Sequence, residues 1–166
     1  MRIPVEVEKR VLAPKEKIMG IQEMIEKNPN AMFGNCFPLN HSFGDGLYIR
    51  EITMPKNMLI VSRLHKFTHP YFILKGKVSV MTEDGVKHIQ APYAGMTKAG
   101  TKRVLYIHEE CVWVTVHANP ENKTDTDILE NDICVDNFED YDKLTGTTPV
   151  EVENFMKEVV KEGICQ

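Results

Sequence analysis

The sequence predicts an all-β fold, an antiparallel barrel or jelly roll with a helix near each end of the chain. Between residues 47 and 118, short segments alternate apolar and polar side chains, which is typical of strands with one buried face. Turn residues divide this region into seven strands, and an N-terminal segment brings the set to about eight, a number that suits a small closed barrel. Helical spacing of apolar residues occurs outside the region, towards both termini.

A chain of 166 residues is long enough to bury its own core, so we expect one domain. Residues 47–118 would form the barrel. Residues 1–46 would supply an N-terminal strand, a helix and a loop packed on it, and residues 119–166 a linker, an edge segment and a C-terminal helix.

Charge and cysteine content exclude several classes of protein. The net charge is -4, and lysine and arginine form no long run, so a nucleic acid is not an expected partner. Charges interrupt the N-terminal segment where a signal peptide needs an apolar core, and no apolar run approaches the ~20 residues of a membrane-spanning helix. The four cysteines form no C-x-x-C pair, which favours reduced thiols and a cytoplasmic location.

The N-terminal part begins with an alternating segment at residues 3–7 that predicts a short strand. Residues 15–27 predict an amphipathic helix whose apolar stripe ends before Asn28 and Pro29. Residues 30–46 contain three glycines and several asparagines, so we expect a loop, in which His41 would be solvated or would reach into a site.

Turn residues separate the segments that predict barrel strands. Pro55 to Asn57, Lys75 with Gly76, and Asp84 with Gly85 are expected to turn the chain, as are residues 108–110. Residues 91–100 have no periodicity and predict a connection across the barrel. The expected strands are residues 47–54, 58–65, 71–74, 78–81, 86–90, 103–107 and 111–118.

After the barrel, the polar residues 119–127 predict a linker. Ile128, Ile133 and Val135 are expected in an edge strand that acidic neighbours keep solvated. A final helix would begin at Thr148, with Pro149 in its first position.

The stretch from Met58 to Val80 resembles the first conserved motif of the cupin family, written G, five residues, H-x-H, three or four residues, E, six residues, G. With Gly76 as the last glycine, His69 stands at the glutamate, His65 at the second histidine and Arg63 at the first. In the second cupin motif, P-x-G-x-x-H-x-x-x-N, Gly100 keeps the glycine and Arg103 replaces the metal histidine. The resemblance therefore implies a cupin barrel whose metal motifs are degenerate.

The pattern from Gly100 to His117 also resembles cupin-like proteins of tailed bacteriophages and bacteria. This resemblance implies a phage-encoded accessory or virion-associated protein, found in the host cytoplasm or the virion. Because cupins commonly dimerise, it also implies a homo-oligomer, which could form part of a phage assembly.

Three histidines are the candidate metal ligands. His65 and His69 lie at a strand end and after a short loop, so both rings can reach one barrel mouth, and His117 can join them if its strand face lines the interior. Neutral imidazoles bind divalent zinc, iron, nickel or manganese, and three of them with a water complete a four-coordinate site. In the alternative, all three are ordinary wall or surface residues and there is no cofactor.

Arg63 and Arg103 favour a different site, because a guanidinium repels a cation. Together with histidines they suit a small polar or anionic ligand, such as a carboxylate, phosphate or sugar acid, and Tyr71 could close this pocket with its hydroxyl. Salt bridges to nearby glutamates are the alternative role for the arginines.

Two functions follow from these patterns. The first is a non-catalytic or degenerate cupin that binds a small ligand through Arg63, His65, His69, Tyr71, Arg103 and His117. The second is a metal-dependent cupin enzyme, an isomerase, dioxygenase or lyase, built on His65, His69 and His117. The sequence contains no G-x-S-x-G or P-loop motif that would indicate a serine hydrolase or a nucleotide-binding protein instead.

Overall fold

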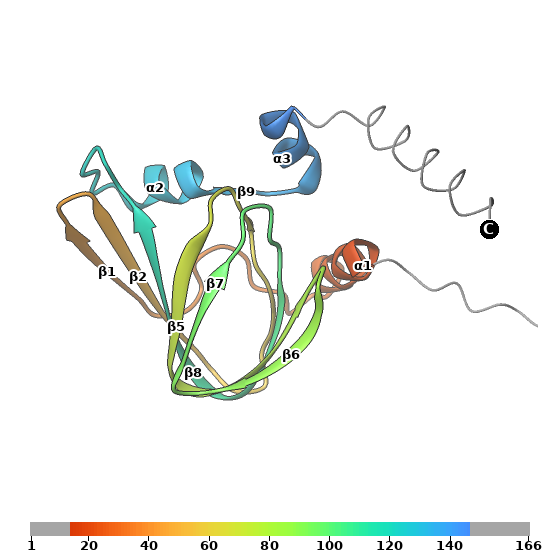
Figure 1. The fold of residues 1–166 in the computed structure, drawn as a ribbon. Coiled ribbons are helices and arrows are strands. Elements are labelled where there is room, and N and C mark those ends of the chain that lie inside the picture. The colour runs from red at the N-terminus through yellow and green to blue at the C-terminus, as the bar shows by residue number, and fades with distance from the viewer. Residues whose placement is uncertain (1–13, 147–166) are drawn as a thin grey trace, which may run out of the picture.

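The structure is a computed structural model that describes residues 14–146, and it confirms the all-β class (Figure 1). A seven-stranded antiparallel sheet curves around the core, and a second sheet of two strands lies at one end. The elements in chain order are α1 (Pro14–Glu26), β1 (Leu39–Gly44), β2 (Leu47–Met54), β3 (Leu59–Val61), β4 (Leu64–His65), β5 (His69–Thr82), β6 (Gly85–Gln90), β7 (Tyr93–Thr97), β8 (Val104–Ala118), α2 (Thr126–Ile133), β9 (Cys134–Val135) and α3 (Phe138–Thr145).

Two long strands, β5 and β8, form the centre of the large sheet. Its strand order is β1-β2-β8-β5-β6, with β3 paired to β8 and β7 paired to β5. The N-terminal half of β5 therefore lies between β7 and β8, and its C-terminal half between β6 and β8. The register between β5 and β8 shifts at Ile73, Lys75 and Lys77, and such bulges bend a sheet into a barrel.

Two of the expected turns are wrong, because the chain continues as a strand through both. Residues 108–110 lie inside β8, and Gly76 lies inside β5. Gly76 has φ +91°, and a Cβ there would lie 2.2 Å from the carbonyl oxygen of Glu110. The glycine thus permits a close approach of β5 to β8 at the bulge, not a reversal of the chain.

Two segments expected to be irregular contain strands. The predicted loop at residues 30–46 includes β1, which pairs with β2, and the predicted connection at residues 91–100 includes β7. Conversely, the single strand expected at residues 58–65 divides into β3 and β4. In each case pairing with a distant strand decides the outcome, and this information is absent from local periodicity.

The segment after the barrel is helical where an edge strand was expected. Asp125 begins α2, because its carboxylate accepts hydrogen bonds from the backbone N–H groups of Asp127 and Ile128, at 3.0 and 3.1 Å. The strand prediction holds only for Val135, in β9, which pairs with β4. The sequence patterns gave no indication of α3. The strand expected at residues 3–7 and the helix expected from Thr148 lie outside the described residues.

Other predictions are confirmed, namely α1, β2, β6 and the turns at Asn57 (φ 64°) and Gly85 (φ 115°). The main core lies inside the sheet and contains Ile73, Val78, Ile107 and Trp113. Complete burial of such a side chain contributes about 1.5–3 kcal/mol. No helix among residues 14–146 is long and apolar enough to cross a membrane.

A second, smaller core packs α2 and β9 against one end of the barrel. It consists of Tyr48, Leu129, Ile133 and Cys134, all nearly inaccessible to solvent. This cluster closes the end of the barrel at which the histidines gather.

Candidate functional site

Three imidazole rings meet at the barrel end covered by α2. The ring centroids of His69 and His117 are 4.3 Å apart, those of His65 and His69 are 4.7 Å apart, and those of His65 and His117 are 6.4 Å apart. The antiparallel register that pairs Tyr71 with Thr115 brings the start of β5 to the end of β8, which accounts for the contact between His69 and His117. His65 comes from β4, a strand of the small two-stranded sheet.

Hydrogen bonds orient two of these rings and indicate their tautomers. Nδ1 of His69 lies 3.0 Å from the carbonyl oxygen of Phe67, and Nδ1 of His65 lies 3.4 Å from that of Thr101. A carbonyl only accepts, so each Nδ1 carries the hydrogen and each Nε2 keeps a lone pair. The Nε2 atom of His69 is buried and has no hydrogen-bond partner in the part of the chain that the structure describes.

Burial keeps all three imidazoles uncharged at neutral pH. Burial, followed by the charges of His69, Arg103 and His117, lowers the pKa of His65 to about 3. Burial, followed by the charges of His69 and Arg50, lowers the pKa of His117 to about 3. The pKa of His69 is also lowered, chiefly by burial.

Uncharged imidazoles have the donor chemistry that a divalent transition metal needs. Nevertheless, within residues 14–146 no group of three His, Cys, Asp or Glu side chains is arranged to hold a metal ion. The described geometry is therefore a contact cluster of histidines.

Arg103 lies next to this cluster, at the start of β8, and only 5% of the residue is exposed. Its Nη2 donates a hydrogen bond to Oγ1 of Thr97, and its Cζ lies 5.0 Å from the ring centroid of Tyr71 and 5.3 Å from that of Trp113. No carboxylate among the described residues pairs with it. Burial lowers the pKa of Arg103 to about 10, so the guanidinium is still charged at neutral pH.

Arg103 lines a pocket of about 280 Å³ whose wall is formed largely by residues of β5, β6 and β7. Lys87 and Lys98 add positive charge at this pocket, and Asp84 supplies the one carboxylate in its wall. The remaining lining residues are Tyr71, Val80, Thr82, Gly85, Val86, Ile89, Tyr93, Met96, Thr97 and Thr101. Lys87 donates a hydrogen bond to the hydroxyl of Tyr93, which lowers the pKa of that phenol.

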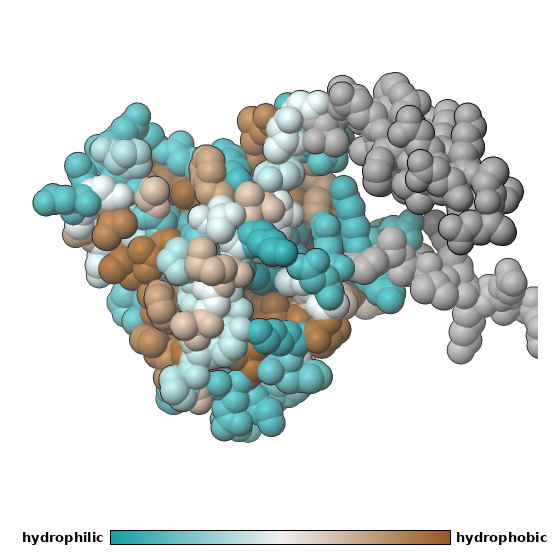
Figure 2. Space-filling model, in the orientation of Figure 1, coloured by the Kyte–Doolittle hydropathy of each residue, from teal (hydrophilic) through white to brown (hydrophobic). Residues whose placement is uncertain are grey.

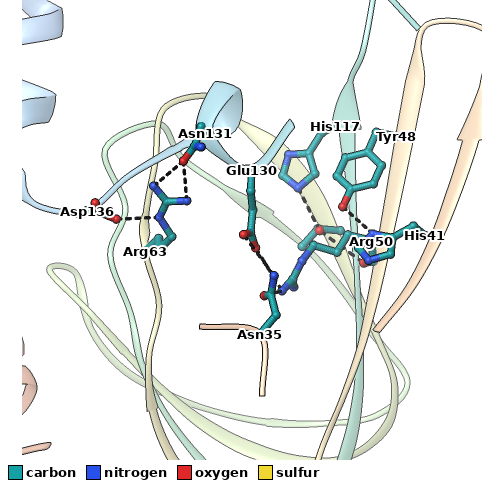
Figure 3. Close-up of polar contacts among 10 residues, drawn as sticks. Asn35, His41, Tyr48, Arg50, Arg63, His117, Glu130, Asn131 and Asp136 are labelled. Carbon is teal, nitrogen blue, oxygen red and sulfur yellow. Dashed lines mark hydrogen bonds and ion pairs between the residues drawn. The ribbon is translucent and has the colours of Figure 1, made fainter. Parts of the chain in front are cut away.

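The structure places Arg63 outside the pocket that Arg103 lines. Its Nε donates to Asp136 at 2.9 Å, and its two terminal nitrogens lie 3.3 and 3.2 Å from Oδ1 of Asn131. Figure 3 shows the side chain directed at these residues of the segment after the barrel, away from His117. Arg63 therefore ties α2 and β9 to the barrel instead of binding a ligand. Arg63 thus forms a salt bridge, with Asp136, whereas Arg103 lines the buried pocket.

His41 and Tyr71 also receive definite positions. His41 lies on β1 and not in a loop, and its Nδ1 is 2.8 Å from the hydroxyl of Tyr48 (Figure 3). Tyr71 is buried, lines the pocket and stacks on Trp113 with the ring centroids 4.6 Å apart.

Sequence reasoning missed three residues that shape this region. Trp113 packs under the guanidinium of Arg103, and its alternation with Thr115 and His117 was the available signal. Nothing in the sequence indicated Thr97. Arg50 was also missed, although its ion pair with Glu130 of α2, at 3.6 Å, helps to close the histidine end (Figure 3).

No protein-family model matches this sequence, and no curated protein matches it. Solved structures do match, and some of them are named as cupins. One is an RmlC-like cupin family protein with a double-stranded β-helix fold from Methanocaldococcus jannaschii, which is 13% identical, with 53% of this chain and 85% of that chain covered and a TM-score of 0.43.

Two further matched structures have similarly low sequence identities. A cupin-2 domain containing protein from Shewanella frigidimarina is 11% identical, with 59% of this chain and 99% of that chain covered and a TM-score of 0.43. Ectoine synthase from P. lautus is 12% identical, with 68% and 84% covered and a TM-score of 0.49. At these identities the likeness concerns the fold and not the reaction or ligand.

Proposed function

We propose that this cupin-like protein binds a small anionic ligand and that Arg103 is the residue that holds it. The observation that carries the proposal is a buried guanidinium that forms no ion pair with a carboxylate among the described residues. A buried charge without a counter-charge is costly to a fold, and it is retained where a bound anion compensates it.

The geometry of Arg103 supports recognition of a carboxylate or phosphate. Both Tyr71 and Trp113 lie within about 5 Å of the guanidinium carbon, and one N–H is used by Thr97. The remaining N–H donors can face the pocket, and paired N–H donors are the arrangement that binds carboxylate and phosphate oxygens. Lys87 and Lys98 in the pocket wall would add long-range attraction.

A binding role also accounts for the chemistry that the sequence lacks. Neither the sequence motifs nor the pocket wall supplies an activated serine or cysteine nucleophile. The resemblance to phage cupin-like proteins supports an accessory or virion-associated role for this binding, and that part of the proposal rests on sequence alone.

Calorimetric titration with acetate, inorganic phosphate and sulfate at low salt tests the proposal. We expect at least one of these anions to bind, and Arg103→Met to weaken that binding about tenfold or more, because charge-assisted hydrogen bonds contribute about 1.5–3 kcal/mol. Arg63→Met is the matched control, since Arg63 is paired with Asp136 outside the pocket. Anion binding that survives in Arg103→Met, or no binding of any of the three anions, would contradict the proposal.

A metal-dependent enzyme, an isomerase, dioxygenase or lyase, is the second candidate. One observation favours it, namely the unpartnered Nε2 of His69 between the rings of His65 and His117. These three side chains would have to leave the described arrangement to hold a zinc, iron, nickel or manganese ion, which would supply a Lewis acid when bound. Elemental analysis of untagged, metal-loaded protein should then show a stoichiometric metal that His69→Ala loses, and loaded protein without metal would eliminate this candidate.

We further propose that two copies associate through the outer face of the sheet. The side chains of Leu47, Ile49, Phe72 and Leu74 are 36–58% exposed there, and the register places Val114 and Val116 beside them. Figure 2 shows brown, hydrophobic surface on the left side of the molecule, where Figure 1 places β2 and β5. Contiguous exposed apolar surface of this kind marks an interaction site, and two sheets pack well face to face.

A further inference from the structure

The structure assigns a chemical class to the anion: we infer that Arg103 and His69 together select a small hydroxy acid, whose acid group pairs with Arg103 and whose hydroxyl donates to Nε2 of His69. This inference rests on the proposed function, because it requires the anion at Arg103. It goes further by separating hydroxy acids from simple carboxylates and inorganic anions.

Arg103 and His69 are neighbours through Thr97. The register of β5 and β7 pairs His69 with Thr97, and side chains of directly opposed residues share one face of a sheet. Arg103 donates its Nη2–H to Oγ1 of this threonine. His69 is not itself among the residues that line the pocket of Arg103, so a small ligand would have to extend past Thr97 to contact both the guanidinium and the imidazole.

The hydrogen bond to Phe67 determines which kind of ligand group His69 can bind. Because Nδ1 carries the hydrogen, the free Nε2 is an acceptor, and a group that satisfies it must be a donor. His65 presents a second Nε2 lone pair beside it for the same reason. A carboxylate or a fully ionised phosphate offers acceptors alone and would leave Nε2 of His69 without a partner.

The charge of Arg103 favours a ligand hydroxyl over a ligand ammonium group as the hydrogen-bond donor to His69. A ligand ammonium group would be placed next to a buried guanidinium and would be repelled, whereas a hydroxyl carries no charge. The imidazoles of the cluster are uncharged and supply no negative charge that could compensate an ammonium. The complementary ligand is thus an acid that bears one or more hydroxyls.

Four probes in a buffer with EDTA test this inference by calorimetry. D-gluconate carries a carboxylate and hydroxyls, hexanoate has the same number of carbons without hydroxyls, sorbitol has hydroxyls without charge, and sulfate is an anion without a donor hydrogen at neutral pH. We expect D-gluconate to bind about tenfold more tightly than hexanoate or sulfate, since a buried acceptor left without its hydrogen bond costs about 1–3 kcal/mol. Sorbitol should not bind measurably.

His69→Phe keeps a ring of similar size and removes the acceptor. It should lower the affinity for D-gluconate to that for hexanoate and leave hexanoate unchanged. His88→Phe, on the exposed surface of β6, is the matched control and should change neither. If His69→Phe does not fold, ¹⁵N NMR of the wild-type imidazoles replaces it: the Nε2 resonance of His69 should shift with D-gluconate and not with hexanoate.

The outcomes separate this inference from the proposed function. Equal, Arg103-dependent affinities for D-gluconate and hexanoate would overturn the hydroxy-acid inference and leave the anion site standing. Absence of binding by all charged probes would overturn both. D-gluconate binding that appears only when a divalent metal replaces EDTA would also overturn the inference, because the hydroxyl would then have the metal as its partner.

Discussion

Mild acid should destabilise this protein through the buried histidines. The pKa of His65 and that of His117 are each lowered from 6.5 to about 3 in the folded state. The unfolded chain therefore binds more protons between pH 6.5 and pH 3, and stability must fall as the pH falls through this range. At pH 5 each histidine lies about 1.5 pH units below its unfolded pKa, which corresponds to about 2 kcal/mol.

The two histidines together predict a loss of about 4 kcal/mol between pH 7.5 and pH 5, a large share of the 5–15 kcal/mol that stabilises a typical domain. Urea unfolding in EDTA buffer measures the loss. Trp113 is the single tryptophan and is 4% exposed, so its fluorescence reports the transition. The urea midpoint should fall progressively at pH 7.5, 6 and 5 with little change in the slope.

Replacing both histidines tests the cause. The double variant His65→Gln, His117→Gln should lose most of the acid dependence between pH 7.5 and pH 5, whatever its stability at neutral pH. The matched control, His88→Gln with His108→Gln, changes two exposed histidines and should retain the wild-type drop. A flat profile in the wild type, or an unchanged drop in the His65/His117 double variant, would refute the assignment to these buried imidazoles.

Three further predictions concern the fold and the outer face. Gly76→Ala should destabilise the protein by several kcal/mol, because its Cβ would overlap a backbone carbonyl at a positive φ, whereas Gly20→Ala in α1 has open space and should stabilise it by up to about 1 kcal/mol in the same urea assay. Asp125→Ala should cost about 1 kcal/mol through loss of the α2 cap, and an unchanged urea midpoint would count against that cap. Phe72→Glu with Leu74→Glu should convert dimers to monomers in light scattering; a wild type that is monomeric at high concentration would argue against the interface.

Local periodicity predicted the elements whose boundaries carry their own signals. Helix α1 ends before Asn28 and Pro29, and β2 ends at a turn that Asn57 makes with a positive φ. Both elements present one apolar face to the core, so the sequence period and the packing agree. For such elements the tertiary structure adds little information.

The long central strands could not be predicted in the same way. Lys75 and Gly76 interrupt the alternation of β5 and resemble a turn, but the register shifts opposite Val112 show that they form a bulge. A bulge and a turn share glycine and a break in period. The choice between them depends on β8, whose residues lie more than thirty positions away in the chain.

The candidate site was predictable in part. Convergence of His65, His69 and His117 beside Arg103 agrees with the expected barrel mouth. Arg63 lies between β3 and β4, where the strand is interrupted. The alternation of side chains that predicted a shared face for Arg63 and His65 therefore does not apply. Its partner Asp136 is 73 residues away, and no local pattern could connect the two.

The position of Arg63 bears on how a ligand would reach Arg103. Arg63 and Arg50 bind α2 and the residues beside it, and Tyr48 packs with Leu129 beneath that helix, so the histidine end of the barrel is closed. The pocket of Arg103 is lined by residues of β6 and β7, and its two lysines, Lys87 and Lys98, belong to this wall. An anion bound as proposed would enter from that side and would meet Arg103 before the imidazoles.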